Sequence, residues 1–370
     1  MKKIIIVGGG LAGMIIAIRL MDAGIHSVVI EKKAFPFHRV CGEYISHEAT
    51  PFLRTMGLYP EALNPATLAR FMLSSIHGKS ETLPLDLGGF GVSRYAFDDF
   101  IYREALRRGV TFQLRTEVAE IRFSDDRFVV KTNSGQLQAD IVIGAFGKRS
   151  RLDVQMARRF TRTRSPYVGI KYHVRTTHPA DLVALHNFPG GYCGICNVED
   201  GKTNVCYLAR RDMLRASGSI PRFQEEVLFR NPLLRDAFAN IGTFVHGPET
   251  INEISFDTKL PVEDHILMAG DAAGMITPLC GNGMAMAIHS GKILADLIIR
   301  HCSDNRFTRA MLESTYTREW KARFQGRLWT GRQVQRLFGN SFASSAAVRI
   351  AMSFKPVAAT IMRNTHGPVF

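Results

Sequence analysis

Cysteine, tryptophan and long uncharged runs are scarce in this 370-residue sequence. Six cysteines in a chain of this length are too few for a disulfide-stapled extracellular protein and favour a reduced, cytoplasmic setting. Internal repeats and low-complexity segments are absent, which excludes a solenoid, a collagen-like chain and a disordered chain. The composition, with 46% hydrophobic and 22% charged residues, is that of a globular protein with a sizeable core.

Two uncharged runs imitate targeting or membrane segments, but neither is convincing. Residues 4–18 follow two lysines as in a signal peptide, yet they contain four glycines and precede no small-residue cleavage site. Residues 272–291 are interrupted by Pro278 and by Gly281-Asn282-Gly283, which makes them a poor membrane span. We therefore expect a cytoplasmic protein that is not integral to a membrane, either free or peripheral at the membrane surface.

Positive charge is concentrated toward the C-terminus. The chain has 47 Lys and Arg against 33 Asp and Glu, a net charge of +14, and residues 301–370 hold eleven basic and three acidic residues. Basic residues between apolar ones over 306–337 predict a helix with a charged face. That face is either solvated or docks on an anionic membrane surface or an acidic carrier protein. No nucleic-acid-binding module is apparent, so we expect no nucleic acid partner.

A nucleotide-binding pattern opens the chain. The apolar run 3–7 predicts a buried parallel strand, residues 14–24 predict a helix, and a second strand over 26–30 ends at Glu31. The Gly-x-Gly-x-x-Gly turn after the first strand allows a tight bend, close approach of a pyrophosphate and close helix packing. Because an acid at the end of the second strand accepts from ribose hydroxyls, the unit predicts an adenine dinucleotide site. The expected contacts are Gly8, Gly10, Leu11, Ala12, Gly13, Glu31 and Lys32.

A second glycine-rich pattern lies far downstream. The apolar strand 266–269 leads into a Gly-Asp pair, and a Pro-x-x-Gly-x-Gly loop then opens a helix over 285–299. An Asp at a strand end suits a polyol hydroxyl, and a helix N-terminus suits partial negative charge on a ring. The expected contacts are Gly270, Asp271, Pro278, Gly281, Asn282, Gly283 and Met284.

With both motifs, residues 1 to about 300 resemble the FAD-dependent oxidoreductases of the geranylgeranyl reductase, aromatic hydroxylase and flavin halogenase superfamily. The resemblance implies non-covalently bound FAD, with its ribitol chain at Asp271 and its isoalloxazine ring on the loop from Pro278. It also implies that Arg39 and Arg94 approach the cofactor, and that the backbone near Val118 meets the adenine.

The resemblance further implies that two loop cysteines lie against the flavin. In some reductases of the family, the loop cysteine that matches Cys41 shapes proton delivery to the reduced double bond. Cys41 and Cys280 are therefore the candidate catalytic residues, with simple packing as the alternative for each. Cys193 and Cys196 form a Cys-x-x-Cys pair on a predicted strand without a second pair nearby, so we expect neither a metal site nor a redox disulfide.

Departures from the family bear on the chemistry. Phe146 stands where hydroxylases carry an Asp for NADPH and FAD handling, which weakens an ordinary NAD(P)H-driven hydroxylase. Both tryptophans lie in the tail, so the tryptophan-containing strands of halogenases and many reductases have no counterpart, and Lys79 lacks the surroundings of a halogenase lysine. No second dinucleotide motif follows a strand, so electrons would come from NAD(P)H at a transient site or from a separate reductase.

The expected fold is α/β, with a Rossmann-like FAD-binding domain, an inserted mixed β-sheet (α+β) substrate domain and a helical C-terminal tail. The FAD-binding domain is discontinuous, because the two cofactor motifs lie on either side of the insertion. The expected boundaries are 1–75, 95–155 and 260–300 for the FAD-binding domain, 76–94 and 156–259 for the substrate domain, and 301–370 for the basic helical segment.

The preferred function is reduction of a carbon–carbon double bond in a lipophilic or carrier-bound substrate. Oxygen insertion by a flavin-dependent monooxygenase is the nearest alternative, and halogenation is less favoured. A flavin-bearing electron-relay or binding protein is the alternative of another class. Anaerobic reduction followed by mixing with oxygen separates the first two, because a long-lived hydroperoxide is typical of oxygenation.

Overall fold

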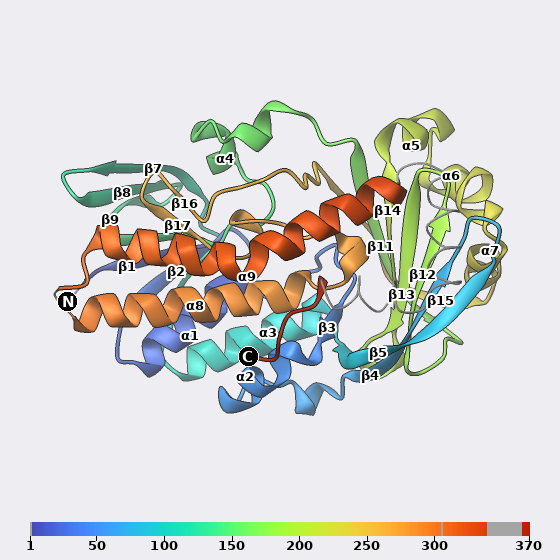
Figure 1. Cartoon of the computed structure of the whole chain (residues 1–370), viewed down its shortest axis with the longest axis horizontal. Coiled ribbons are helices and arrows are strands. Elements are labelled where there is room, and N and C mark those ends of the chain that lie inside the picture. Colours follow the sequence, from blue (N-terminus) through green and yellow to red (C-terminus); the bar gives the residue numbers. More distant parts are fainter. Residues whose placement is uncertain (1, 305, 339–364) are drawn as a thin grey trace.

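The computed structural model describes residues 2–304, 306–338 and 365–370, and two large β-sheets and a layer of long helices dominate it (Figure 1). The first sheet and the long helices form the end of the molecule that carries the N-terminus, and the second sheet forms the opposite end. The α/β architecture with a C-terminal helix confirms the expected fold class.

The first sheet has the order β16-β17-β10-β1-β2-β6, and all its neighbouring pairs except β16–β17 are parallel. Its strands are β1 (Ile4–Val7), β2 (Ser27–Glu31), β6 (Thr111–Leu114), β10 (Ile141–Gly144), β16 (Val262–Glu263) and β17 (Ile266–Met268). All four side chains of β1 are buried, as the continuous apolar run predicts, because helices and a small third sheet pack into the same core. That third sheet consists of β7 (Val118–Ser124), β8 (Arg127–Thr132) and β9 (Gly135–Ala139).

Four long helices pack beside this sheet. Helix α8 lies between α1 and α9, and α3 packs against α1. The long helices are α1 (Leu11–Asp22), α3 (Arg94–Arg107), α8 (Gly283–Ser303) and α9 (Arg309–Phe338), and the short ones nearby are α2 (Thr50–Thr55) and α4 (Arg151–Gln155). None of the helices in the described ranges is both long enough and apolar enough to cross a membrane.

The second sheet has eight strands in the order β15-β11-β14-β13-β12-β4-β5-β3, and it is mixed because β12 pairs with β4 in parallel. Its strands are β3 (Tyr44–Ser46), β4 (Ala66–Ser74), β5 (Ser80–Gly91), β11 (Tyr167–Thr176), β12 (Leu182–Phe188), β13 (Gly191–Asn197), β14 (Thr203–Arg210) and β15 (Ile241–Asn252). The helices α5 (Arg211–Ser217), α6 (Ile220–Glu226) and α7 (Pro232–Ala239) pack at its far end (Figure 1).

The expected boundary at residue 75 needs a correction. Strands β3 and β4 lie before that boundary, yet β3 pairs with β5, and β4 pairs with β5 and β12, so both belong to the second sheet. Alternation of polar and apolar residues is weak in β4, whose side chains are mostly half-buried or exposed, so its sequence does not reveal which sheet it joins. The remaining domain boundaries stay predictions.

The last described residues return to the first domain and hold α9 in place. Arg327 of α9 is buried and forms an ion pair with the buried Glu48, at 2.9 Å between Nη2 and Oε1. The carbonyl of Thr365 accepts from Arg327 and from Asn282, and the backbone N–H of Phe370 donates to the carbonyl of Glu48. Arg327 therefore does not belong to the charged outer face that the sequence predicts for this helix. Residues 339–364 of the expected tail lie outside the described residues.

Replacing Arg327 should test how much this buried pair stabilises the fold. Arg327→Met leaves the carboxylate of Glu48 buried without its cation, so the free energy of unfolding should fall by about 3–5 kcal/mol. Arg323→Met, at an exposed position one turn earlier, should change it by only about 0.5 kcal/mol or less. Chemical denaturation measures both, and equal losses in the two variants would contradict the assignment.

Candidate active site

A cavity of about 1080 Å³ lies between the two sheets, and residues of both glycine-rich motifs line it. Every site residue expected from the sequence except Gly13 contributes to its wall. Those that do are Gly8, Gly10, Leu11, Ala12, Glu31, Lys32, Arg39, Cys41, Arg94, Val118, Gly270, Asp271, Pro278, Cys280, Gly281, Asn282, Gly283 and Met284. The structure thus brings two motifs that lie some 260 positions apart in the chain to one place.

The glycines of the first motif differ in what surrounds them. A Cβ on Gly8, which has φ +110°, would lie 2.3 Å from the carbonyl oxygen of Ala145, and one on Gly13 would lie 2.1 Å from the carbonyl oxygen of Gly8. These two glycines are needed for folding, since α1 could not otherwise approach β1 and β10. A Cβ on Gly10 meets nothing within 4 Å, so it would project into open space at the N-terminus of α1. That space, in front of free backbone N–H groups, suits a pyrophosphate.

Glu31 ends β2 with its carboxylate held in position. Oε2 accepts from the backbone N–H of Gly9 at 2.9 Å, and Oε1 accepts from the backbone N–H of Lys33 at 3.1 Å. Each carboxylate oxygen can accept a further hydrogen bond, so Glu31 can still bind a ribose hydroxyl at the cavity wall.

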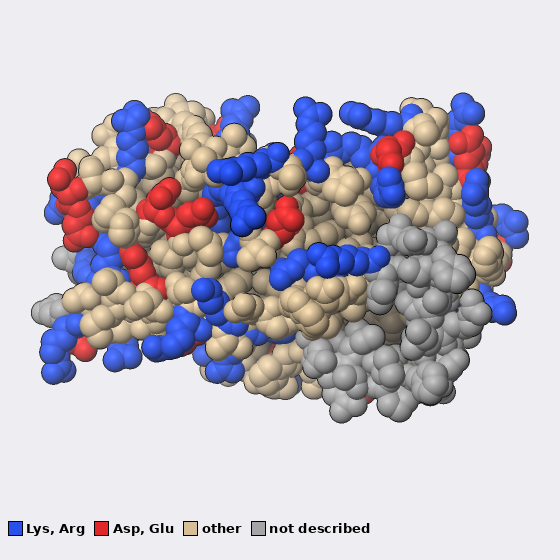
Figure 2. Space-filling model, turned by 45° about the horizontal axis from the view of Figure 1, so that its top comes forward, with Lys and Arg blue, Asp and Glu red and all other residues tan. Residues whose placement is uncertain are grey.

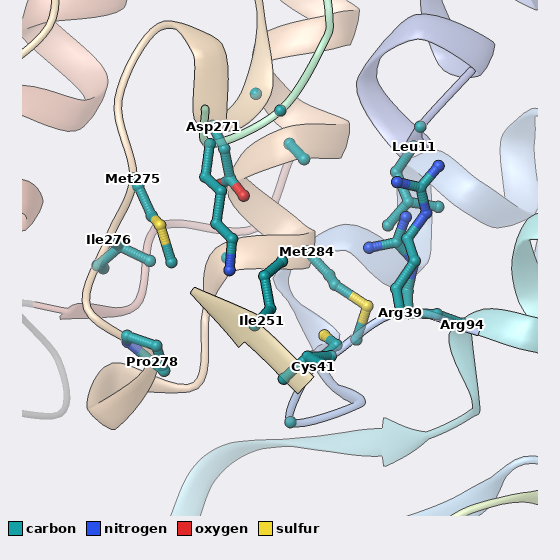
Figure 3. Close-up of a pocket in the computed structure, with 18 of the residues that line it drawn as sticks. Leu11, Arg39, Cys41, Arg94, Ile251, Asp271, Met275, Ile276, Pro278 and Met284 are labelled. Carbon is teal, nitrogen blue, oxygen red and sulfur yellow. The ribbon is translucent and has the colours of Figure 1, made fainter. Parts of the chain in front are cut away.

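Two arginines share one buried carboxylate at this side of the cavity. Asp98 of α3 accepts from Arg39 Nε at 3.1 Å and from Arg94 Nε and Nη2 at 2.7 Å each. Figure 3 shows Arg39 and Arg94 close together on the side of the cavity where Leu11 lies. Although burial lowers the pKa of Arg94, the charge of Asp98 more than compensates and raises it, so this guanidinium stays charged.

Arg39 keeps an unused donor. Its Nη2 is buried and has no hydrogen-bond partner among the described residues, and Glu31 Oε2 lies 3.7 Å away. A buried guanidinium N–H without a partner is costly, and a phosphate oxygen is a suitable acceptor for it. The open cradle at Gly10 and this free donor together fit the diphosphate of FAD.

The second motif forms the opposite wall. The chain leaves β17 through a 3₁₀ turn, Gly270–Ala272, and reaches α8 through a second one, Pro278–Cys280. Gly281 follows with φ +66°, a conformation that favours glycine. Figure 3 shows Asp271 and Pro278 on one side of the same space, with Cys41 and Met284 across from them. The loop before α8 thus presents backbone groups to the cavity, as the resemblance implies for the isoalloxazine ring.

The two candidate catalytic thiols are both protonated at neutral pH. Burial raises the pKa of Cys41, whose Sγ lies 3.4 Å from the backbone N–H of Glu43. Burial also raises the pKa of Cys280 to about 11, and its Sγ lies 3.3 Å from Thr277 Oγ1. Such thiols are poor nucleophiles but can donate a proton. Their catalytic role stays a prediction.

Cys193 and Cys196, the Cys-x-x-Cys pair, lie buried on β13. Burial raises the pKa of Cys193 and of Cys196, and both are free thiols. In the part of the chain that the structure describes, no three His, Cys, Asp or Glu side chains gather as metal ligands would.

Sequence reasoning missed three ionisable residues, two of them behind Glu43 and one in direct contact with the cavity. Lys148 lines it, and burial lowers the pKa of its amine to about 8 against the opposing charge of Asp271. Lys171 and His173 lie on β11, where they alternate with the apolar Ile170 and Tyr172. Both are buried against Glu43. The alternation of polar and apolar residues along this strand was the sequence signal that could have indicated them.

Comparison with known proteins identifies the family. A family profile described as FAD binding domain matches residues 1–326. The chain belongs to this FAD-binding family. Its members are FAD-dependent oxidoreductases, and FAD is accordingly the cofactor of this enzyme.

Relatives within the family catalyse different reactions. The chain is 26% identical to digeranylgeranylglycerophospholipid reductase 2 of Methanopyrus kandleri over 340 residues. The aligned region covers 87% of this chain and 82% of the relative. It is 25% identical to the FAD-dependent monooxygenase adrH of Penicillium rubens, over 86% of this chain and 73% of that protein. The structure of the flavin-dependent brominase Bmp2 has the same fold, with a TM-score of 0.78, 17% identity and coverage of 97% of this chain and 92% of that one.

The open space at Gly10 leads to a sharp prediction for this FAD-binding enzyme. Gly10→Val should fold with nearly unchanged thermal stability as apoprotein, because the added side chain meets no protein atom, but it should retain no FAD. Asp271→Ala should also lose FAD, because it removes an acceptor for a ribitol hydroxyl. Absorbance of FAD released by heat measures occupancy, and full occupancy in either folded variant would contradict the assigned contacts.

Proposed function

We propose that this enzyme reduces a carbon–carbon double bond in a lipophilic substrate. The observation that carries the proposal is the apolar part of the cavity, which lies along the second sheet and the loop before α8. Its wall consists of Phe71, Leu73, Leu83, Leu85, Val183, Leu185, Ile195, Ile251, Met275, Ile276, Leu279 and Val334. Such a lining suits a hydrocarbon chain and excludes water from it.

Each part of the cavity has a role in this reaction. Bound FAD supplies hydride from its reduced ring. The apolar wall orients the double bond, the loop from Gly281 to Gly283 holds the ring, and the protonated thiol of Cys41 is available beside it as a proton source. The reductase from Methanopyrus kandleri, similar over most of both chains, supports a polyisoprenoid lipid as the substrate class.

Oxygen insertion is the second candidate, supported by the similarity to a monooxygenase. Phe146 lines the cavity in place of the Asp that hydroxylases of the superfamily use for NADPH and FAD handling, which disfavours it. For either reaction we propose that NAD(P)H at a transient site or a separate reductase supplies the electrons.

A direct test uses the reduced enzyme and a geranylgeranylated glycerophospholipid in detergent micelles. The flavin should be reoxidised anaerobically by the lipid, and mass spectrometry should find the product heavier by two hydrogens for each reduced bond. Mixing the reduced enzyme with oxygen should give oxidised flavin without a long-lived intermediate. A stable hydroperoxide spectrum together with no anaerobic reoxidation would favour the monooxygenase instead.

We also propose that this enzyme is cytoplasmic and binds an anionic membrane surface through α9. Four basic residues on this helix are exposed, namely Arg318, Lys321, Arg323 and Arg336. Trp329 on the same helix is 58% exposed, and exposed tryptophan is typical of membrane interfaces. In the view of Figure 2, Lys and Arg side chains cover more of the surface than Asp and Glu. Binding to a membrane would bring the enzyme to the place where a lipid substrate is found.

Charge reversal on α9 tests the membrane proposal. Arg318→Glu, Lys321→Glu and Arg323→Glu together should abolish co-sedimentation with phosphatidylserine-containing vesicles at low salt, since each basic contact contributes about 1 kcal/mol. FAD content should not change, because none of these residues lines the cavity. Binding of the wild type to an acidic acyl carrier protein instead of vesicles, or salt-insensitive binding, would contradict the proposal.

A further inference from the structure

We propose that the carboxylate of Glu43 is the proton-transfer group of the cavity, supplied from His173 and connected to solvent by a stack of imidazoles. This inference rests on the proposed reduction, which consumes a proton for every hydride it transfers. It adds to the site a residue pair that no cofactor motif contains.

Glu43 is fully buried, lines the cavity and is held from three sides. Its Oε1 accepts from the backbone N–H of Arg94 at 2.7 Å and from Lys171 Nζ, and its Oε2 lies 2.5 Å from His173 Nε2. Lys171 Nζ also donates to the carbonyl of Arg39 at 3.1 Å. The charge of Lys171 and the hydrogen bond from His173 outweigh burial and lower the pKa of Glu43, so the carboxylate is ionised at rest.

The buried cluster of Glu43, Lys171 and His173 lowers the stability of the fold. Glu43, Lys171 and His173 are each at most 2% exposed, and burying charged groups costs free energy that their mutual attraction seldom exceeds. Glu43 also has φ +56°, in the left-handed region that non-glycine residues avoid. Buried charge and backbone strain together at a cavity wall are typical of functional sites rather than of structural pairs.

A line of rings leads from this cluster toward the surface. The ring of His38 lies edge-on to that of His173, with 5.6 Å between centroids, and is stacked on His246 at 3.5 Å. His246 Nε2 lies 2.9 Å from Glu249 Oε1, and these two side chains are 35% and 38% exposed. The line of groups therefore runs along the cavity wall, which His38 and Glu249 also line, and ends at two partly exposed side chains.

His38 is the intermediate group of this line. Its Nδ1 is buried without a hydrogen-bond partner among the described residues, which leaves it available to a bridging water. Burial is the main cause that lowers the pKa of His38 to about 4. The charges of His246, Lys171 and His173 act in the same direction, and the charge of Glu249 opposes them. Tyr95 covers its other side at 4.4 Å. A neutral imidazole can accept a proton at one nitrogen and release one at the other.

The proton balance of the step is simple. Hydride from the reduced flavin forms a C–H bond at one carbon of the double bond, and the electron pair of the broken π bond takes a proton at the other carbon. Glu43 passes that proton on from His173, directly or through the thiol of Cys41. Solvent then returns one proton to His173 by way of His246 and His38, which restores the resting cluster.

Proton uptake can be measured without any lipid substrate. The FAD-loaded protein is reduced anaerobically with methyl viologen radical, whose oxidation releases no proton, in weak buffer in a stopped-flow instrument, and a pH dye follows proton uptake while absorbance follows flavin reduction. In the wild type the two should coincide. In Glu43→Gln and in His173→Asn we expect proton uptake to lag at least about tenfold, in line with the usual effect of losing a positioned acid–base group.

The matched control is Glu199→Gln. Glu199 is also a buried carboxylate paired with a lysine, with Lys202 Nζ at 2.8 Å and the backbone N–H of Ser93 at 2.6 Å, but it does not line the cavity. This variant should lose stability without any lag in proton uptake. Added formate should shorten the lag in Glu43→Gln, because a small acid can replace a missing proton donor but cannot repair a structural defect.

A variant on the surface side keeps the proposal testable if Glu43→Gln fails to fold. His246→Phe retains a ring against His38 and removes the exchangeable proton at a partly exposed position, and it should also delay uptake. Coincident reduction and proton uptake in His246→Phe and in Glu43→Gln would overturn the proposal. If these variants show the lag but the wild-type enzyme does not reduce lipid double bonds, the proton path stands and the proposed reaction is wrong.

Discussion

Ion pairs made by the segment 39–48 connect the first domain, the second sheet and the C-terminal helix around the cavity. Arg39 is paired with Asp98 on α3, Glu43 with Lys171 on β11, and Glu48 with Arg327 on α9. One short stretch of chain is thereby attached to the first domain, the second sheet and the C-terminal helix. Because Glu43, Glu48 and their two cations are buried, moving β11 or α9 would leave an uncompensated charge in the interior, which costs several kcal/mol, whereas Asp98 would keep Arg94 as a partner.

This attachment explains why a large cavity persists between the sheets. The apolar walls on either side would bury more surface if they collapsed on each other, but the charged pairs around them hold a fixed distance. This arrangement leaves room for a dinucleotide and, in the proposed function, for a lipophilic substrate. The same segment supplies Cys41 and Glu43 to the wall of the cavity.

Local signals in the sequence accounted for the cofactor half of the molecule and for little of the rest. The first strand, the glycine turn and the acid at Glu31 follow from hydrophobic runs and backbone geometry, which are short-range properties, and the FAD-binding family and the fold class are confirmed. The pairing of β4 with β12 and the burial of Arg327 depend on residues more than a hundred positions away. A basic residue on an amphipathic helix has the same sequence pattern whether it meets water or a buried glutamate. Contact of the expected site residues with FAD stays a prediction.

The interleaving of the two sheets has a consequence for how the chain acquires its structure. Strand β4 pairs with β12, which is made about a hundred residues later, and β17 joins the first sheet only after the second sheet has been synthesised. Neither sheet can therefore be completed while the ribosome is still making the first half of the chain, and non-local pairing of this kind slows folding. Nascent chains will expose unpaired apolar strands for a long time, which makes them natural clients of chaperones. The same topology means that the two halves cannot be exchanged between relatives by a single crossover.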